Sequence, residues 1–231
     1  MGATLIINLK NYPKAFGSGA VAFAKSAESV SASFKDVEII IAPPMPDLAL
    51  VAESCSISVF SQSVDYGGIG QSTGKVVPEA LVASGVQGVI INHSENRVGI
   101  SKAKILLENA KAAGLKACIC VENGYEASAA ASMNPDYVAI EPRELIGSGV
   151  SVSSAKPDLI RDAKNACGSH FSGKILAGAG ISSDADAKAA LLLGADGVIV
   201  SSAIAKSTEP EKAIYSLAAA LGRGKVKHVE G

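Results

Sequence analysis

Residues 89–93, Val-Ile-Ile-Asn-His, decide the fold because an apolar run ends there in polar side chains. Two other runs end in the same way. Residues 6–10, Ile-Ile-Asn-Leu-Lys, end in an ammonium group, and residues 137–141, Tyr-Val-Ala-Ile-Glu, end in a carboxylate. Short apolar β-branched runs are typical of parallel strands that are covered on both faces. The carboxyl ends of such strands meet at one mouth of a closed barrel, so we expect the three charged or titratable groups to share that mouth.

Apolar runs and Ala-rich helical stretches alternate along the whole chain. We expect strands over Thr4–Leu9, Val37–Ala42, Ser58–Ser61, Gly88–Ile91, Lys116–Val121, Tyr137–Ile140, Lys174–Ala177 and Gly197–Val200. We expect helices near Gly19–Ser33, Asp47–Ser54, Pro78–Ser84, Ser101–Ala113, Gly124–Ala131, Ala155–Cys167, Asp184–Leu193 and Glu209–Leu221. No GxGxxG motif follows the first strand to mark an open, doubly wound sheet. The sequence therefore predicts an α/β fold, a closed eight-stranded parallel (β/α)8 barrel.

Helix boundaries carry recognisable signals. Ser183, Ser154 and Thr208 stand where side-chain N-caps are expected, and Pro210 follows Thr208 closely, as a first-turn proline does. Ser94 and Glu95 can cap a short helix after the fourth strand. An imidazole aimed at such a helix N-terminus stays neutral, because the positive end of the helix dipole disfavours a second positive charge.

Composition limits the function classes. The 231 residues are 48% hydrophobic and 19% charged, with a net charge of -1, so there is no overall basic footprint for nucleic acid. No apolar stretch reaches the roughly 20 residues that span a membrane, and we expect neither membrane nor nucleic acid as a partner. No composition shift divides the chain, so we expect one barrel domain over residues 1–231 with a frayed polar tail at residues 222–231.

The four cysteines are not spaced as metal ligands or as CxxC pairs. Cys118 and Cys120 alternate along a predicted strand, so both thiols should face the same side. Buried, reduced thiols are typical of a cytoplasmic protein, and the N-terminus carries no leader pattern. We therefore expect a cytoplasmic location and neither metal nor redox cofactor.

The strand ends carry the candidate chemistry. Lys10 can attract a phosphate monoester and stabilise charge on oxygen, and Asn8, two residues earlier, points to the same side. His93 in neutral form can donate a proton to a developing enolate oxygen. Glu141 precedes a proline, and Gly147, Ser148 and Gly149 supply flexible joints a few residues later. A fixed hinge followed by a permissive one is what a loop that closes over a ligand requires.

The loops after the seventh and eighth strands contain small residues. Residues 178–181 read Gly-Ala-Gly-Ile, and residues 201–203 read Ser-Ser-Ala. Small residues allow backbone N–H groups to approach a ligand, and barrels often bind phosphate at these two loops. We therefore expect a phosphate cradle there.

Taken together, these motifs resemble the triosephosphate isomerase family, and its shorter archaeal members most closely. The resemblance covers nearly the whole chain in register. It rests on residues 8–10, 92–97, 141–142 with 145–149, and 178–181. Gln62 and residues 72–74 resemble the third loop, which protrudes in this family.

The resemblance implies a TIM barrel that interconverts dihydroxyacetone phosphate and D-glyceraldehyde 3-phosphate in glycolysis and gluconeogenesis. It implies that Glu141 is the base, His93 the neutral electrophile and Lys10 their electrostatic partner. The implied substrate-binding residues are Asn8, Lys10, Ile146, Gly147, Gly180, Ser201 and Ser202. It also implies a homodimer or homotetramer formed through the loop around Gly67–Thr73, whose Thr73 would reach a neighbour's active site.

Two other classes of protein remain as alternatives. A metal-dependent sugar-phosphate epimerase needs His and Asp ligands on several strand ends, but of three histidines, His170 and His228 lie in a helix-end loop and in the tail. A Schiff-base aldolase needs an inward lysine, whereas Lys116 and Lys174 stand at strand starts. A non-catalytic binder of phosphorylated metabolites is the second class. The joint presence of an ammonium, an imidazole and a carboxylate at strand ends argues against it.

Overall fold

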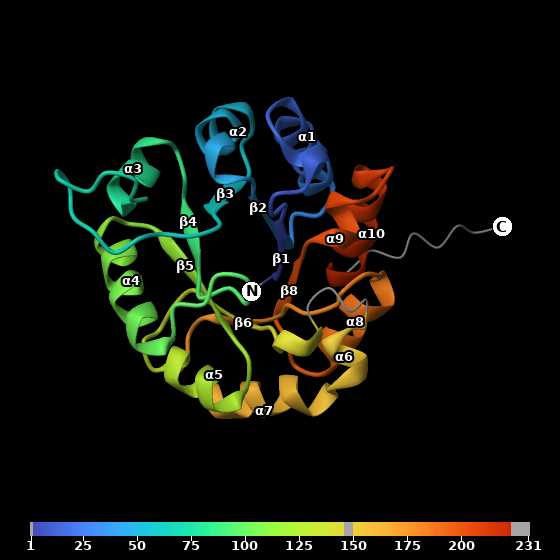
Figure 1. The fold of residues 1–231 in the computed structure, drawn as a ribbon. Helices are drawn as coiled ribbons and strands as arrows, with labels where there is room; N and C mark the ends of the chain where they lie inside the picture. Colours follow the sequence, from blue (N-terminus) through green and yellow to red (C-terminus); the bar gives the residue numbers. More distant parts are fainter. Residues whose placement is uncertain (1, 146–149, 223–231) are drawn as a thin grey trace.

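The computed structural model describes residues 2–145 and 150–222, and it confirms the closed parallel barrel. Each strand pairs in parallel with its two neighbours, and β8 closes the ring onto β1. Figure 1 shows the helices arranged as a ring around the strands. The strands are β1 Ala3–Asn8, β2 Val37–Ala42, β3 Ser58–Ser61, β4 Gly88–Ile91, β5 Lys116–Val121, β6 Tyr137–Ile140, β7 Lys174–Ala177 and β8 Gly197–Val200.

Helices follow the strands around the outside. The α-helices are α1 Ser18–Ser33, α2 Leu48–Ser54, α3 Pro78–Ala83, α4 Ile100–Ala112, α5 Gly124–Ala131, α6 Val152–Ala155, α7 Pro157–Cys167, α8 Asp184–Leu192, α9 Ser202–Ala205 and α10 Pro210–Leu221. The short 3-10 helices of the described residues are η1 Pro13–Ala15, η2 Met45–Asp47 and η3 Arg143–Leu145. Seven strand ranges match the predicted ones, and the first begins and ends one residue earlier than expected.

The predicted caps have mixed outcomes. Ser183 caps α8 through a complete capping box with Asp186. Ser154 is not a cap, because the expected helix is divided: Ser151 caps α6, and Pro157 starts α7 after Lys156, whose backbone is not helical. Thr208 is not a cap either. Glu209 occupies the N-cap of α10 without a side-chain hydrogen bond, although Pro210 does open the helix.

Alternation along the strands produces two cores. Leu5 and Ile7 point outward into the layer between strands and helices, whereas Ile6 packs inside the barrel. Cys118 and Cys120 face the same side, as their spacing predicts, and that side is the barrel interior. Side chains therefore fill the barrel, and a ligand has access only to its ends.

A partly buried charged cluster closes the amino-terminal end of the barrel. Glu38 accepts hydrogen bonds from Lys116, Lys174 and the Tyr137 hydroxyl at 2.9–3.1 Å. Burial pushes the pKa of Glu38 upward, but the hydrogen bonds and positive charges outweigh it and lower the pKa to about 2. Both lysines thus lie at the end away from Lys10, His93 and Glu141, as their strand positions predict.

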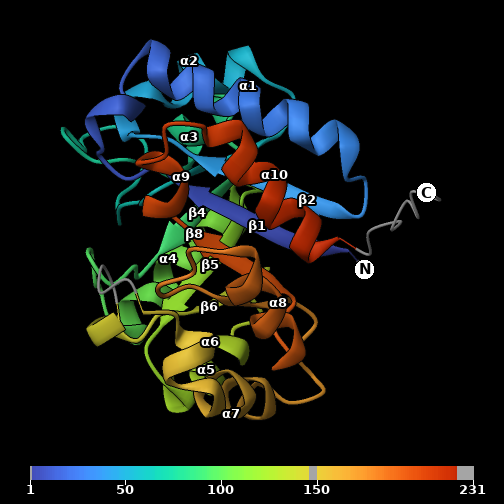
Figure 2. The same ribbon diagram turned by 90° about the vertical axis from the view of Figure 1, so that its right-hand side faces the viewer.

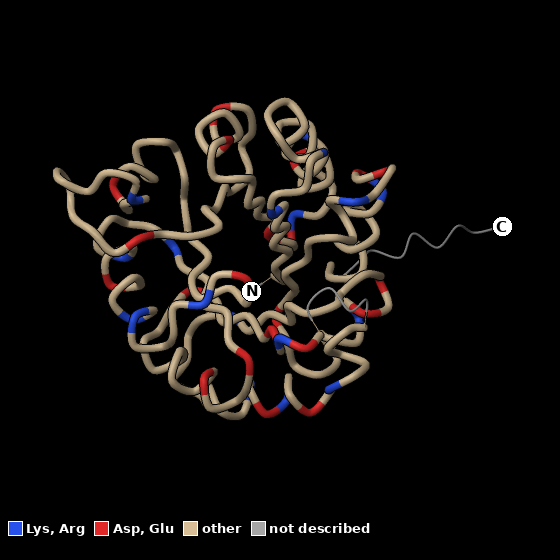
Figure 3. The backbone as a smooth tube through the Cα atoms, in the orientation of Figure 1, with Lys and Arg blue, Asp and Glu red and all other residues tan. Residues whose placement is uncertain are grey.

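The side view distinguishes the two ends of the barrel (Figure 2). In Figure 2, α9 lies at the end opposite the N-terminus, because it directly follows the carboxyl end of β8. Figure 3 shows acidic and basic residues distributed around the ring, with neither sign gathered on one side. Among the described residues, no helix has the length and apolarity needed to cross a membrane. The expected tail, apart from Gly222, lies outside the described residues.

Candidate active site

Lys10 is held at the mouth of the barrel by its own backbone. Its φ of 48° is left-handed, and its N–H donates to the Asn8 side-chain oxygen at 3.0 Å. Gln62 donates from its side-chain nitrogen to the Lys10 carbonyl at 3.0 Å and to the Ala42 carbonyl at 3.2 Å. The Lys10 ammonium is paired with Glu95 at 2.8 Å. A strained, non-glycine conformation kept by three side-chain contacts is typical of a functional position.

His93 follows β4, but no helix follows it directly. Residues 93–96 form a turn closed by the Asn96 N–H on the His93 carbonyl, and α4 begins at Ile100. The prediction of a short helix capped by Ser94 and Glu95 was therefore wrong. Instead, the Glu95 N–H donates to Nδ1 of His93 at 3.1 Å. An Nδ1 atom that accepts a hydrogen bond carries no proton, so the ring presents a protonated Nε2 to the cavity.

Asn92 holds the loop that carries His93. Its φ of 63° turns the chain at the strand end, and its side chain donates to the Cys120 carbonyl at 2.8 Å. The same amide accepts from the N–H groups of Val98 and Gly99 at 3.0 and 2.9 Å. Asn92 thus ties the loop that carries His93 to β5 on one side and to the residues just before α4 on the other, and this fixes the position of the imidazole.

Glu141 directly follows β6 and is only 2% exposed. Its Oε2 lies 3.6 Å from Nε2 of His93, too far for a hydrogen bond, and it has no hydrogen-bond partner among the described residues. Beside it, the pKa of the Cys120 thiol is raised well above its usual range by the hydrogen bond with Cys118, by burial and by the Glu141 charge. A buried carboxylate oxygen without a partner is available to take a proton from a ligand.

Two glycines shape the wall opposite His93. A Cβ on Gly178 would lie 2.4 Å from Cγ of Glu141, so only glycine leaves room for this carboxylate. Gly180 has a φ of +68°, and a Cβ there would lie 1.9 Å from the Val150 carbonyl oxygen. The loop after β7 therefore lies against the Glu141 carboxylate at Gly178 and against the Val150 backbone at Gly180.

Two adjoining cavities open at this mouth. Asn8, Lys10, His93, Glu141 and Ser201 line a small cavity of about 30 Å³. A second cavity of about 360 Å³ shares part of that lining and extends over the seventh and eighth loops. It is lined by Lys10, Tyr12, Gly178, Gly180, Ile181, Ser182, Ile199, Val200, Ser201, Ser202, Ala203 and Lys206. The Ser201 hydroxyl is buried there without a hydrogen-bond partner in the described part of the chain.

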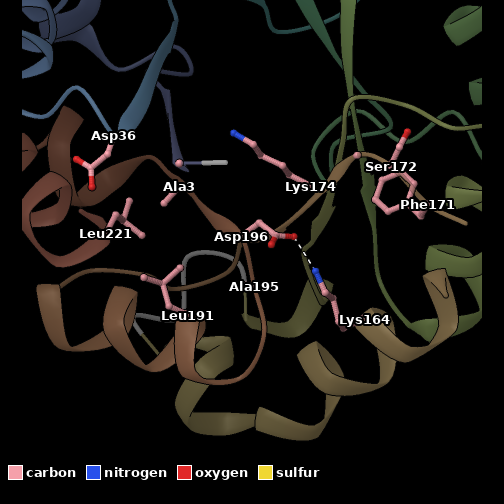
Figure 4. A pocket seen from close by; sticks show the side chains of 12 residues that line it. Ala3, Asp36, Lys164, Phe171, Ser172, Lys174, Leu191, Ala195, Asp196 and Leu221 are labelled. Atoms are coloured by element: carbon pink, nitrogen blue, oxygen red, sulfur yellow. Dashed lines mark hydrogen bonds and ion pairs between the residues drawn. The ribbon is translucent and has the colours of Figure 1, made fainter. Parts of the chain in front are cut away.

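A cavity larger than either of these lies at the other end of the barrel. Its volume is about 670 Å³, and Figure 4 shows Lys174 pointing into it beside the ion pair of Lys164 and Asp196. Its lining contains no histidine, so it has no pair of carboxylate and imidazole like Glu141 and His93. Size alone would therefore select the wrong end, and the chemistry selects the carboxyl end.

The structure brings together most of the residues predicted from the sequence. Asn8, Lys10, His93, Glu141, Gly180, Ser201 and Ser202 all line the two adjoining cavities. Ile146 and Gly147, which the sequence also indicates, lie outside the described residues. Sequence reasoning missed Tyr12 and Lys206, and it missed the contact between Gly178 and Glu141. Within residues 2–145 and 150–222, no three His, Cys, Asp or Glu side chains gather where they could hold a metal ion.

Comparison with known proteins places the chain in a family. The family model described as triosephosphate isomerase matches residues 3–218. A triosephosphate isomerase of Methanosarcina acetivorans is 42% identical over 214 residues, which cover 92% of this chain and 96% of that protein. One from Cenarchaeum symbiosum is 43% identical over 217 residues, covering 94% and 97%. One from Methanocaldococcus jannaschii is 37% identical over 214 residues, covering 92% and 97%.

The match spans the barrel and the mouth where the ammonium, imidazole and carboxylate meet. The chain therefore belongs to the triosephosphate isomerase family and is an isomerase.

Proposed function

We propose that this protein interconverts dihydroxyacetone phosphate and D-glyceraldehyde 3-phosphate, in glycolysis and gluconeogenesis. The observation that carries the proposal is the pairing of a buried carboxylate with an imidazole across one small cavity. Oε2 of Glu141 lies 3.6 Å from Nε2 of His93, and Lys10 lines the same cavity. Moving a proton between adjacent carbons requires a base, a proton donor for oxygen and a positive charge near that oxygen.

Each of the three residues has one task in this mechanism. Glu141 removes a proton from the carbon next to the carbonyl group, and the electron pair moves onto the carbonyl oxygen to give an enediolate. His93 donates its Nε2 proton to that oxygen and later takes a proton from the neighbouring hydroxyl group. Glu141 then returns its proton to the other carbon, and Lys10 stabilises the negative charge on oxygen throughout.

The phosphate group would lie over the seventh and eighth loops. Gly180, Ser201 and Ser202 line the larger cavity beside the catalytic trio, and glycine at position 180 permits close backbone approach. We assign the opposite side of the grip to Ile146 and Gly147, on the basis of the family resemblance. Asn8 positions Lys10 through the hydrogen bond from the Lys10 N–H.

We also propose that the protein acts in the cytoplasm as a homodimer or homotetramer. Its four cysteines are free, and two of them are buried, as expected in a reducing compartment. The loop between β3 and α3 projects from the ring in Figure 1, and its residues Tyr66 and Ile69 are 62% and 79% exposed. An exposed apolar loop tip is typical of a contact between subunits.

A coupled assay tests the proposed reaction. Purified protein is given D-glyceraldehyde 3-phosphate, and formation of dihydroxyacetone phosphate is followed by its enzymatic reduction with NADH. We expect rapid turnover that a metal chelator leaves unchanged. No turnover would favour a non-catalytic phosphometabolite-binding protein. Turnover that a chelator abolishes would indicate a metal-dependent mechanism such as that of an epimerase.

A further inference from the structure

Lys206 lies at the end of the single helical turn that follows β8. It is the C-cap of α9, and its N–H donates to the Ser202 carbonyl at 3.1 Å. Residues four apart on a helix lie on the same face, so Ser202 and Lys206 face the same side. Both line the 360 Å³ cavity over the seventh and eighth loops. The turn therefore presents a positive charge to the space assigned to phosphate.

A second element fixes the position of this charge. Tyr12 comes from the loop after β1, and the Lys206 ammonium lies 5.3 Å from the centroid of its ring. The tyrosine is half-buried and lines the same cavity. An ammonium over an aromatic face is attracted to the ring, and it keeps its outer side free for an anion. Tyr12 therefore holds an otherwise mobile side chain at the rim of the cavity.

The charge balance of the mouth shows why this cation matters. The Lys10 ammonium is already paired with Glu95 at 2.8 Å, so its charge is largely matched. Glu141 adds a negative charge on the floor of the mouth, as a base must. Lys206 is exposed, and none of the ion pairs found among the described residues involves it. Lys206 therefore adds a positive charge, without an ion-pair partner among the described residues, to a mouth that has to hold a phosphate monoester with close to two negative charges.

We propose that Lys206, held by the ring of Tyr12, is a substrate-binding residue that contacts the phosphate group. This inference rests on the proposed function, because it assigns the site a phosphorylated ligand. The phosphate does not change during an enediolate reaction, so Lys206 binds substrate and transition state equally. Uniform binding of this kind lowers KM and leaves kcat nearly unchanged. Its long-range charge also speeds association at low salt.

The test compares Lys206→Gln with the wild type in steady-state kinetics across a range of salt concentrations. We expect KM for D-glyceraldehyde 3-phosphate to rise roughly 10-fold and kcat to stay within about twofold. The inhibition constant of inorganic phosphate should rise in parallel, and kcat/KM should depend less on salt. Lys206→Arg should restore most of the affinity. Tyr12→Leu should raise KM by a smaller factor, and Tyr12→Phe should recover most of the affinity that Tyr12→Leu loses, because it keeps the aromatic face.

The matched control is Lys35→Gln. Lys35 is exposed and lies between α1 and β2, at the amino-terminal end of the barrel, so its loss should change neither KM nor the salt dependence. The proposal would be overturned if KM and the salt dependence of kcat/KM were unchanged in Lys206→Gln. It would also be overturned if kcat fell while KM stayed the same. Calorimetric titration of wild type and Lys206→Gln with inorganic phosphate separates this failure from that of the proposed function. Weaker binding to the variant supports Lys206 even if the wild type shows no turnover.

Discussion

Among single residues, Glu141 lowers the stability of the fold, because its carboxylate is buried. It is 2% exposed, and one carboxylate oxygen has no hydrogen-bond partner in the described chain. A buried polar atom without a partner costs on the order of 1–3 kcal/mol, so packing alone does not explain its presence. Gly178 maintains the arrangement, because any side chain there would displace the carboxylate. Such a locally unfavourable group is most simply explained by its chemistry.

Shortening this side chain tests its role as the base. We expect Glu141→Asp to fold normally and to lose on the order of 100-fold in kcat, because the carboxylate retreats by ~1 Å from the reacting carbon. Circular dichroism and thermal unfolding establish that the fold is intact, and the coupled assay gives kcat. Wild-type turnover in this variant would exclude Glu141 as the base.

The imidazole is tested by a side chain of similar reach. Gln at position 93 can still donate a hydrogen bond, but it cannot exchange a proton with an enediolate oxygen. We expect His93→Gln to lower kcat by roughly 100-fold or more while the inhibition constant of inorganic phosphate stays within about threefold. Equal losses of turnover and of phosphate binding would instead indicate a histidine that only maintains the structure of the mouth.

At the scale of elements, local pattern predicted the strands and left short turns undetected. The strands are apolar almost throughout, and their alternation also predicted that Cys118 and Cys120 face the same side, which the structure shows to be the barrel interior. The one-turn helices α6 and α9 were missed because four residues are too few to show helical periodicity. Pro157 was the available signal that the helix expected from Ala155 begins later.

Contacts between distant segments explain what was missed at the site. Each strand end predicted its own polar residue, since a barrel directs all carboxyl ends to one mouth. Gln62 reaches Lys10 across 52 residues, and Tyr12 meets Lys206 across the closure of β8 onto β1. No local pattern marks such pairs. Their members become visible only when the barrel is closed.

The role of the loop between β3 and α3 in subunit association can be tested by measuring the molecular mass of the protein in solution. Its base is closed by the Asp65 N–H on the Val76 carbonyl at 2.8 Å and by the Val76 N–H on the Asp65 carboxylate at 2.8 Å. If its tip enters a neighbouring subunit, Ile69→Asp buries a charge there and should give a monomer of reduced activity. Light scattering after size exclusion measures the mass.

A control distinguishes this loop from other exposed apolar residues. Leu192 on α8 is 88% exposed, and Leu192→Asp should leave the mass unchanged. An unaltered oligomer in Ile69→Asp would show that the subunits associate through another surface. A wild-type protein that is already monomeric would remove the oligomer from the proposal.

The stability of the whole molecule depends on pH through the charged cluster at the amino-terminal end. The pKa of Glu38 is lowered from 4.5 to about 2 in the folded protein, so the folded state holds this proton less tightly than the unfolded state. Glu38 therefore stabilises the fold fully above about pH 4.5, and this contribution disappears as the pH falls toward 2. We expect Glu38→Gln to lower the free energy of unfolding at pH 7 by about 2 kcal/mol, since Lys174 loses a half-buried partner.

Urea unfolding of wild type and variant between pH 7 and pH 2.5 measures this effect. The difference in unfolding free energy should stay constant down to about pH 5 and then shrink, because the wild-type carboxylate becomes protonated as well. The exposed Glu108, 4.0 Å from Lys104, is the matched control, and Glu108→Gln should change stability by less than about 0.5 kcal/mol. If the difference in unfolding free energy between wild type and Glu38→Gln did not vary with pH, the contribution of Glu38 would come from packing and neutral hydrogen bonds. The charge of Glu38 would then not be what stabilises the contact between β2, β5 and β7 at this end of the barrel.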